Sequence, residues 1–303
     1  MITYIALTFT ALFWGLSFIG TKIALTSFSP FVCIFLRFSL ASCFFLFILA
    51  KKGSFSSGLK EHKKLFILAL FQPGLYFTFE TVGLTYTSAS EASIILGLVP
   101  LAVMILARVL LGEEITLKNL FGISLSIIGI SILVLGGPGF DWAFKGSFYG
   151  DILILGAVIA AAFYMVLARD LAKNLSALEI TGFQVIYGTI IFSPFFLIKA
   201  GEIQWVMVSV QSIGAIIFLS LFATIGGFLS YNFALTRTTA SKASVFINGI
   251  PVVTAVGAWL ILSERLSWLQ IIGGIIVLSA VFITSTSNIA KNTAEKKRLQ
   301  LLD

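Results

Sequence analysis

The sequence predicts an all-α membrane protein in which ten transmembrane helices form two inverted five-helix repeats. Three observations lead to this prediction: an apolar composition, regularly spaced apolar runs and an internal duplication. Of the 303 residues, 58% are hydrophobic and only 11% are charged, and the mean hydropathy is +1.06. Soluble domains carry roughly a quarter charged residues, so a soluble fold could not bury this much apolar surface. The lipid bilayer is therefore an expected partner of the chain.

Apolar runs of about 20 residues, the length that crosses the hydrocarbon core as a helix, recur along the whole chain. The expected helices cover residues 3–24, 31–50, 65–84, 89–111, 117–136, 148–169, 178–198, 211–235, 240–262 and 268–286. Their connections contain charged or turn-forming residues, as at Pro30 and in 51–64, 136–139 and 263–265. The N-terminal segment has no basic start and no small-residue cleavage pattern, so we expect it to be retained as the first helix.

An internal duplication is the most informative feature of the sequence. When Pro100 is set beside Pro251, 151 positions later, the chain aligns with itself without a gap from Phe77 to Gly122. Identical polar residues match in register, among them the pairs Thr85/Thr236, Thr87/Thr238, Ser90/Ser241, Ser93/Ser244 and Glu113/Glu264. Because each copy holds an odd number of helices, the second copy must lie upside down in the membrane relative to the first.

The positive charges predict the orientation of the helices. With a cytoplasmic N-terminus, the connection 51–64, which holds five lysines, and the basic tail both face the cytoplasm, where Lys and Arg are in excess. The duplicated positions agree, because Tyr86 and Glu91 on the outer side correspond to Arg237 and Lys242 on the inner side. We therefore expect a multi-pass protein of a bacterial inner membrane with both termini in the cytoplasm.

Motifs in both halves carry a family resemblance. They are Trp14-Gly15 with Phe18, Arg37, residues 87–90 leading to Pro100, 111–113, 164–169, 238–243 leading to Pro251, and 262–264. Together they resemble the bacterial EamA-like carriers of the drug/metabolite transporter superfamily over nearly the whole chain. Ser263 departs from the pattern, because the family commonly has Gly there.

This resemblance implies a first five-helix repeat at 1–138, a second at 139–288 and a basic cytoplasmic tail at 289–303. It also implies a central cavity lined largely by helices one, three, four, six, eight and nine, with alternating access from the two sides. Such carriers usually export amino acids, metabolites or drugs. The expected function is therefore secondary-active export of a small organic solute, and import of a metabolite by the same fold is the alternative.

Polar and aromatic residues inside the apolar spans are the candidate substrate-binding residues. Glu80 lies inside the third span, where it could bind a cationic group or carry a coupled proton, or could instead extend outward and end the helix. The other candidates, each equally suited to helix packing, are Trp14, Ser17, Tyr76, Tyr164, Tyr231, Asn232 and Asn248. Arg37 is expected instead to bond to a backbone carbonyl or a neighbouring helix.

Pro100 and Pro251 occupy equivalent positions in the middle of their spans. Each removes an amide donor and crowds the preceding turn, so both predict kinks that act either as hinges for alternating access or as fixed features of packing. Glu113 and Glu264 end the same two spans, and we expect each to cap the free amides of the helix that follows it.

Other functional classes have little support in the sequence. The single His, His62, lies in a basic connection, and no cluster of metal ligands or pair of buried Asp residues indicates an intramembrane enzyme. No catalytic residue, metal or cofactor is therefore expected. The dispersed positive charge does not indicate nucleic-acid binding. A non-transporting scaffold subunit is the third alternative, and the oligomeric state is not predicted.

Overall fold

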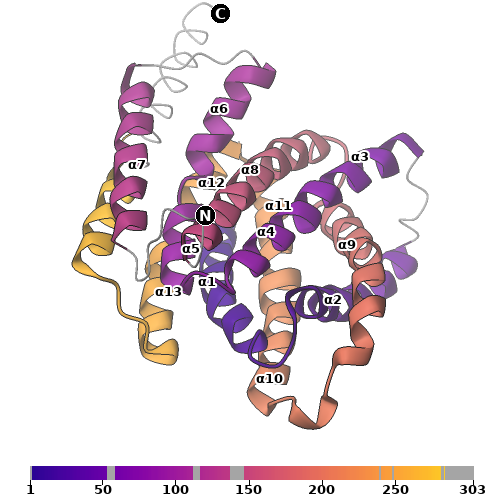
Figure 1. The fold of residues 1–303 in the computed structure, drawn as a ribbon. Coiled ribbons are helices and arrows are strands. Elements are labelled where there is room, and N and C mark those ends of the chain that lie inside the picture. The colour runs from indigo at the N-terminus through magenta and orange to yellow at the C-terminus, as the bar shows by residue number, and fades with distance from the viewer. Residues whose placement is uncertain are drawn as a thin grey trace, which may run out of the picture.

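The computed structural model describes residues 2–52, 59–111, 117–136, 147–238, 240–247, 249–280 and 283, and within them every regular element is a helix (Figure 1). The α-helices are α1 (Ile2–Ala24), α2 (Pro30–Lys52), α3 (Leu59–Ala69), α4 (Tyr76–Gly83), α5 (Ala89–Leu96), α6 (Val99–Leu111), α7 (Leu117–Leu135), α8 (Ser147–Leu171), α9 (Ala177–Lys199), α10 (Val210–Phe218), α11 (Phe228–Leu235), α12 (Ala240–Ile247), α13 (Ile250–Gly257) and a last helix, Trp268–Ala280. Three π-helical segments, η2 (Leu70–Leu75), η5 (Leu219–Gly227) and η6 (Ala258–Leu262), continue α3, α10 and α13. Two short 3-10 helices, Ala200–Glu202 and Trp205–Met207, connect α9 to α10.

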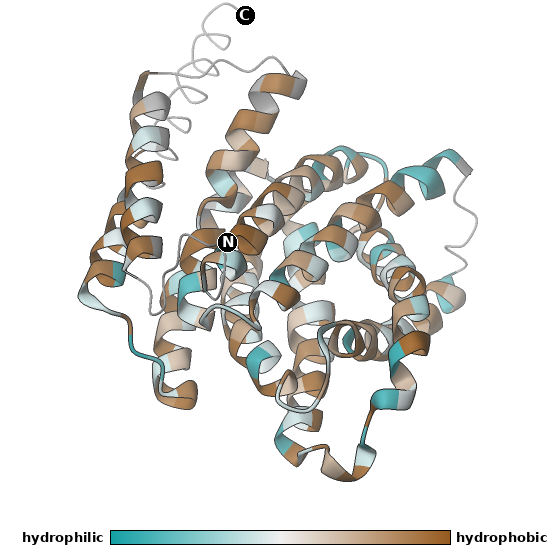
Figure 2. Ribbon diagram, in the orientation of Figure 1, coloured by the Kyte–Doolittle hydropathy of each residue, from teal (hydrophilic) through white to brown (hydrophobic). Residues whose placement is uncertain are grey.

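Seven of these helical segments are long and apolar enough to cross a membrane. They are Ile2–Ala24, Pro30–Lys52, Lys60–Gly83, Ala89–Leu106, Ser147–Leu171, Ala177–Glu202 and Val210–Leu235, and shorter apolar helices cover Ile250–Leu262 and Trp268–Ala280. Hydrophobic residues extend along most helices, whereas hydrophilic ones gather near the start of α3 and between α9 and α10 (Figure 2). A segment that crosses lipid must satisfy its backbone polar groups internally, and an apolar helix of this length does so. The chain is therefore a multi-pass membrane protein.

The third predicted span is not a continuous α-helix. It begins earlier than predicted, at Leu59, and it contains the π-helical segment η2. Within η2, Gln72 has non-helical backbone angles (φ −146°, ψ 112°), because Pro73 disfavours a helical conformation of the residue before it. The span therefore consists of α3 and α4 joined by an irregular turn in the middle of the bundle.

The spans that hold Pro100 and Pro251 are also divided. The first breaks at Gly97–Leu98 into α5 and α6, and the second separates α12 from α13. Both prolines are the second residues of the half-helices that follow, where a missing N–H disrupts no intrahelical bond. Each proline therefore begins a half-helix, which corrects the prediction that it kinks a continuous one.

The element boundaries repeat along the chain. Adding 151 to the bounds of α5 gives those of α12, and adding 151 to the bounds of α6 gives those of α13 with η6. The packing repeats in the same way, since α5 contacts α13 and α6 contacts α12, while α4 contacts α8 and α11 contacts α1. The two halves therefore share one order of helices and breaks.

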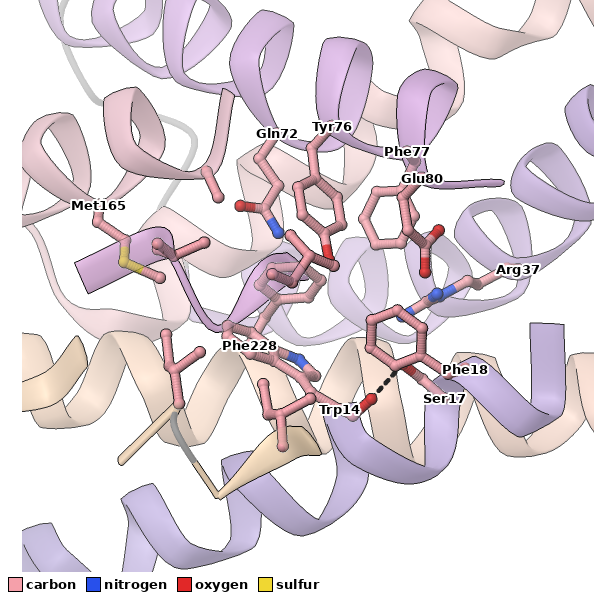
Figure 3. Close-up of a pocket in the computed structure, with 15 residues that line it drawn as sticks. Trp14, Ser17, Phe18, Arg37, Gln72, Tyr76, Phe77, Glu80, Met165 and Phe228 are labelled. Atoms are coloured by element: carbon pink, nitrogen blue, oxygen red, sulfur yellow. Dashed lines mark hydrogen bonds between the residues drawn. The ribbon is translucent and has the colours of Figure 1, made fainter. Parts of the chain in front are cut away.

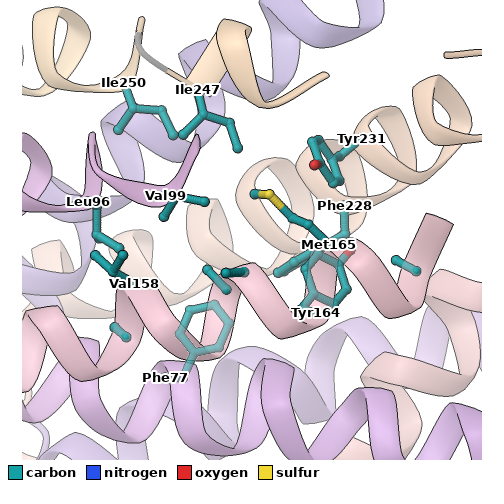
Figure 4. Close-up of a cluster of buried hydrophobic side chains, with 14 of the residues drawn as sticks. Phe77, Leu96, Val99, Val158, Tyr164, Met165, Phe228, Tyr231, Ile247 and Ile250 are labelled. Carbon is teal, nitrogen blue, oxygen red and sulfur yellow. The ribbon is translucent and has the colours of Figure 1, made fainter. Parts of the chain in front are cut away.

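The buried core lies where the halves meet. Hydrophobic side chains of α4, α5, α8, α11 and α13 converge there, including Phe77, Leu96, Val158, Phe228 and Ile250 (Figure 4).

Polar contacts join the connections at each end of the bundle. At one end, Lys64 forms an ion pair with Asp170 at 3.4 Å, and Arg169 donates to the backbone oxygen of Leu235. At the other end, Ser267 donates to the backbone oxygen of Gly136 at 2.8 Å, and Ser27 and Ser209 of the 24–30 and 200–210 connections bond to each other. Described residues that are far apart in the sequence are therefore held together near the ends of the helices.

Candidate functional site

A narrow cavity of about 30 Å³ lies between the two halves (Figure 3). Side chains of α1, η2, α4, α5, α6, α8, α11, α12 and α13 line it, which are the elements that the family resemblance implied, and α2 adds Arg37. Its polar lining consists of Ser17, Arg37, Gln72, Tyr76 and Glu80. Its larger apolar lining includes Trp14, Phe18, Phe77, Met165 and Phe228. A largely apolar cavity with a few converging polar groups has the character of a small-molecule site.

Trp14 forms one wall of this cavity. Its indole N–H donates to the backbone oxygen of Ala223 at 3.2 Å, and its ring lies 5.1 Å from that of Phe228. Gly227 makes this position possible, because a Cβ there would lie only 2.5 Å from the indole nitrogen. Ser17, one turn further along α1, donates to the backbone oxygen of Trp14 at 2.7 Å. The indole is therefore fixed by the backbone of η5 across the bundle.

The opposite wall is polar and comes from η2 and α4. Tyr76 and Glu80 are four residues apart on α4, so their side chains face the same direction, and the irregular turn of η2 brings Gln72 to the same cavity. The Gln72 side-chain oxygen is buried without a hydrogen-bond partner, and Glu80 is 1% exposed and accepts from the Thr81 hydroxyl at 2.9 Å. An unsatisfied amide and a buried carboxylate on one face leave hydrogen-bonding capacity directed into the cavity.

Arg37 joins the two walls. Its Nε donates to the Thr224 hydroxyl at 2.6 Å, and its guanidinium carbon lies 4.5 Å from the centre of the Phe77 ring. The bond to Thr224 of η5 confirms the prediction that Arg37 would bond to a neighbouring helix. The sequence did not indicate that the same side chain also lines the cavity, where it points toward Glu80 and attracts its charge (Figure 3).

Three predicted site residues lie behind the cavity wall and not among its lining. Tyr164, Tyr231 and Asn232 are fully buried, and the Tyr164 hydroxyl donates to the Asn232 side-chain oxygen at 3.0 Å. The Asn232 amide in turn donates to the Thr181 hydroxyl at 2.9 Å. These bonds tie α8, α9 and α11 together, and the Tyr231 ring packs 5.2 Å from that of Trp14. Asn248 lies outside the described residues.

The two helix breaks border the cavity. Leu96 and Val99, on either side of the first break, line it, and so do Ile247 and Ile250 on either side of the second. A Cβ on Gly97 would lie 3.7 Å from the Pro251 ring, so the breaks also face each other. Pro100 and Pro251 therefore flank the site without forming its surface.

Glu264 is a helix cap, but it caps a different helix from the one predicted. Its carboxylate accepts from the backbone N–H of Ala89 at 3.0 Å and of Ser90 at 3.1 Å, at the start of α5. The helix that follows Glu264 does not need it, because Ser267 and Gln270 cap that helix reciprocally. Its counterpart Glu113 lies outside the described residues.

The fold and the cavity define a class: a helical, multi-pass membrane protein with a partly polar cavity between two halves. The model of the EamA-like transporter family matches residues 1–135 and 148–286, so the chain belongs to that family of transporters. An uncharacterized transporter of Archaeoglobus fulgidus is 30% identical over 92% of this chain and 97% of its own length. The uncharacterized transporter YcxC of Bacillus subtilis is 31% identical over 96% and 94%. A crystal structure of another protein shares the fold, with a TM-score of 0.66 over 94% of this chain and 98% of the other, at 17% identity.

Proposed function

We propose that this protein is a secondary-active transporter that exports small organic metabolites, amino acids or drugs by alternating access. The observation that carries the proposal is the cavity, which both halves line and which the two helix breaks flank. Solute sites of secondary transporters lie at such repeat interfaces, next to discontinuous helices. Family membership supports transport itself.

The proposed architecture is ten membrane crossings in two inverted repeats. It is supported by the 151-residue correspondence of helix bounds and by the two stretches that match the family model, 1–135 and 148–286. Pro100 and Pro251 are the proposed hinges, since each begins a half-helix beside the cavity. Rotation about these breaks would move α6 and α13 relative to α5 and α12.

The proposed location is a bacterial inner membrane, with both termini in the cytoplasm. The end of the bundle that would face the cytoplasm carries Lys51, Lys52, Lys60, Lys63, Lys64, Arg169, Lys173 and Arg237. The described residues at the other end carry fewer basic groups, chiefly Lys22, Lys199 and Arg265, and Lys199 is paired with Glu202. This difference follows the excess of Lys and Arg in cytoplasmic loops.

The proposed solute-binding residues are Trp14, Ser17, Tyr76 and Glu80, which share the cavity. Trp14 and Tyr76 provide aromatic surface, and Glu80 is the proposed partner for a cationic group of the solute. Tyr164, Tyr231 and Asn232 support this surface from behind, through the Trp14 ring and the α8–α11 bonds. A small amphipathic solute with a polar head fits this distribution.

Transport by purified protein in liposomes tests the proposal. A panel of labelled amino acids and amphipathic drugs is offered to the wild type, to Trp14→Ala and to the control Trp268→Ala, whose ring is 80% exposed and lies away from the cavity. We expect the wild type and the control to move at least one solute that Trp14→Ala does not. Transport by none of them across the panel would favour a scaffold role. Net uptake, and not extrusion, in vesicles of known orientation would favour an importer.

A further inference from the structure

Two buried carboxyl groups lie together outside the cavity, at the end of the bundle proposed to face outward. Asp151 is near the start of α8 and Glu91 is in the first turn of α5, and each is only 1% exposed. Glycines bring the two elements together, because a Cβ on Gly150 would lie 2.9 Å from the backbone oxygen of Gly83 and 3.0 Å from the amide of Thr87. The close approach of α8 to the turn between α4 and α5 therefore buries Asp151 beside Glu91.

The hydrogen bonds of this pair are incomplete. The Thr87 hydroxyl donates to one Glu91 oxygen at 3.0 Å, and the other Glu91 oxygen has no partner. Both carboxylate oxygens of Asp151 are also buried without a partner. A hydroxyl has one proton to donate, so Thr87 cannot serve both carboxylates at once. Three of the four oxygens thus lack a donor.

The charges around the pair add repulsion. The Glu91 charge acts unfavourably on Asp151, and Glu264, from the segment before the last helix, acts in the same way on Glu91. Glu264 is itself held by the α5 amides and interacts with Lys22 of α1. The Gln270 side chain lies beside Glu91 and favours its charged form, and the Tyr86 and Tyr149 rings pack edge to face nearby. Among the described residues, no Lys or Arg forms an ion pair with Asp151 or Glu91.

We propose that Asp151 and Glu91 form a proton-binding site that holds one proton between them. Two unpaired carboxylates cannot both stay ionised in a buried site without a large desolvation and repulsion cost. A single proton taken up from that side forms an O–H bond on one carboxyl group and removes one of the two like charges. Two carboxylates and one hydroxyl are too few oxygens for a bound Ca²⁺.

The site is placed to couple this proton to the cavity. Glu91 is on α5, whose Leu96 lines the cavity just before the first break, and Asp151 is on α8, whose Ala161 and Met165 line it. Release of the proton leaves two like charges that push α5 away from α8. Protonation therefore favours the close packing of α5 against α8 seen here. This coupling rests on the proposed transport function, whereas the proton site itself does not.

Infrared spectroscopy of the purified protein in lipid nanodiscs, titrated with pH, tests the site without any solute. We expect a protonated-carboxyl band in the wild type that is lost in both Asp151→Asn and Glu91→Gln, because each variant supplies an amide donor and leaves the remaining carboxylate ionised. The double variant should lose no more than either single one, as a shared proton requires. The matched control is Asp170→Asn on the same helix, whose side chain is 52% exposed and paired with lysines, and it should lose nothing.

Stability provides a second readout on the same samples. The folded state holds a proton that the unfolded chain does not hold at the same pH, so the melting temperature of the wild type should fall as the pH rises through the titration. Asp151→Asn and Glu91→Gln should flatten this dependence. If one variant fails to fold, the other carries the same expectation. Unchanged bands in both variants, or losses that add in the double variant, would overturn the shared-proton site.

Coupling is measured separately in liposomes. One proton exchanged per solute allows about tenfold accumulation for each pH unit of gradient. The wild type should approach this ratio, and Asp151→Asn should only equilibrate the solute. Accumulation by Asp151→Asn equal to that of the wild type would overturn the coupling. A wild type that moves no solute would instead contradict the proposed function and leave the infrared result to decide the proton site.

Discussion

Equivalent faces of the two halves contribute to the cavity in opposite ways. Gln72, Tyr76 and Glu80 in the first half correspond, 151 positions later, to Ala223, Gly227 and Tyr231 in the second. The first set directs an amide, a phenol and a carboxylate into the cavity. The second set presents a backbone oxygen to the Trp14 indole, a glycine that leaves it room and a ring that packs 5.2 Å from it.

Two copies of one helical arrangement can therefore form an asymmetric site. The shared helix breaks and packing place both faces at the centre of the bundle, whatever side chains they carry. Substitution at three positions then makes one face polar and lets the other accept an aromatic residue from α1. The polar wall can orient a solute, while the aromatic wall supplies contact area, and neither half provides both.

Arg37 connects the two faces, so its removal should have the largest effect. It bonds Thr224 on one side and faces Glu80 on the other. We expect Arg37→Leu to destabilise the folded protein by about 3–5 kcal/mol, because it leaves the Glu80 carboxylate buried without an opposite charge. Thermal and denaturant unfolding in detergent measure this loss. The double variant with Glu80→Gln should lose clearly less, and equal losses in the two variants would show that the two charges are not coupled.

The aromatic face depends on Gly227. A methyl group there would lie 2.5 Å from the Trp14 nitrogen and 2.8 Å from its neighbouring ring carbon. We expect Gly227→Ala to cost about 1–3 kcal/mol by overpacking and to reduce transport. Gly214→Ala is the matched control, because nothing lies within 4 Å of its Cβ position. Equal melting temperatures for the two variants would contradict the account of the aromatic wall.

The polar face depends on Glu80. We expect Glu80→Gln to weaken binding of solutes with a cationic group by roughly tenfold, as the loss of one charge-assisted hydrogen bond predicts. Binding of neutral analogues should change little, because the amide keeps the shape of the side chain. Ligand-induced thermal shifts across a paired set of charged and neutral solutes measure the difference. A uniform loss for both kinds of solute would remove Glu80 from the recognition of charge.

The smallest effect is expected at the Trp14 indole N–H. Trp14→Phe keeps an aromatic ring but loses the bond to the Ala223 backbone oxygen, which should cost about 0.6 kcal/mol, as is typical of hydrogen bonds between membrane helices, beyond the packing lost with the smaller ring. Denaturant unfolding resolves a change of this size. A loss of unfolding free energy as large as that of Gly227→Ala would mean that the hydrogen bond, and not the packing, fixes the position of the Trp14 ring.

Most helices were predictable, because hydropathy and the duplication both report on segments about as long as the membrane is thick. The breaks were less visible. Pro100 and Pro251 marked the right regions, but periodicity could not show that each proline starts a new half-helix. The irregular turn at Gln72 was missed, although Pro73 provided a signal for it.

The site was predictable only in part. Trp14, Ser17, Tyr76 and Glu80 meet in the cavity, while Tyr164 and Asn232 satisfy each other behind it. A polar residue in an apolar span has the same appearance in a sequence whether it faces a cavity or a neighbouring helix. Contacts between distant helices explain the remaining misses, since Glu264 reaches the start of α5 across 175 positions and Arg37 of α2 extends into the cavity.

Labelling of Ser17→Cys tests most directly whether the cavity opens alternately to the two sides of the membrane. The variant is made in a Cys43→Ser background, because Cys43 is exposed and Cys33 is buried. A membrane-impermeant maleimide is applied from each side of oriented vesicles, with and without a transported solute. We expect labelling from both sides, with the solute raising one rate as it lowers the other. Labelling from one side only, whether or not solute is present, would contradict alternating access.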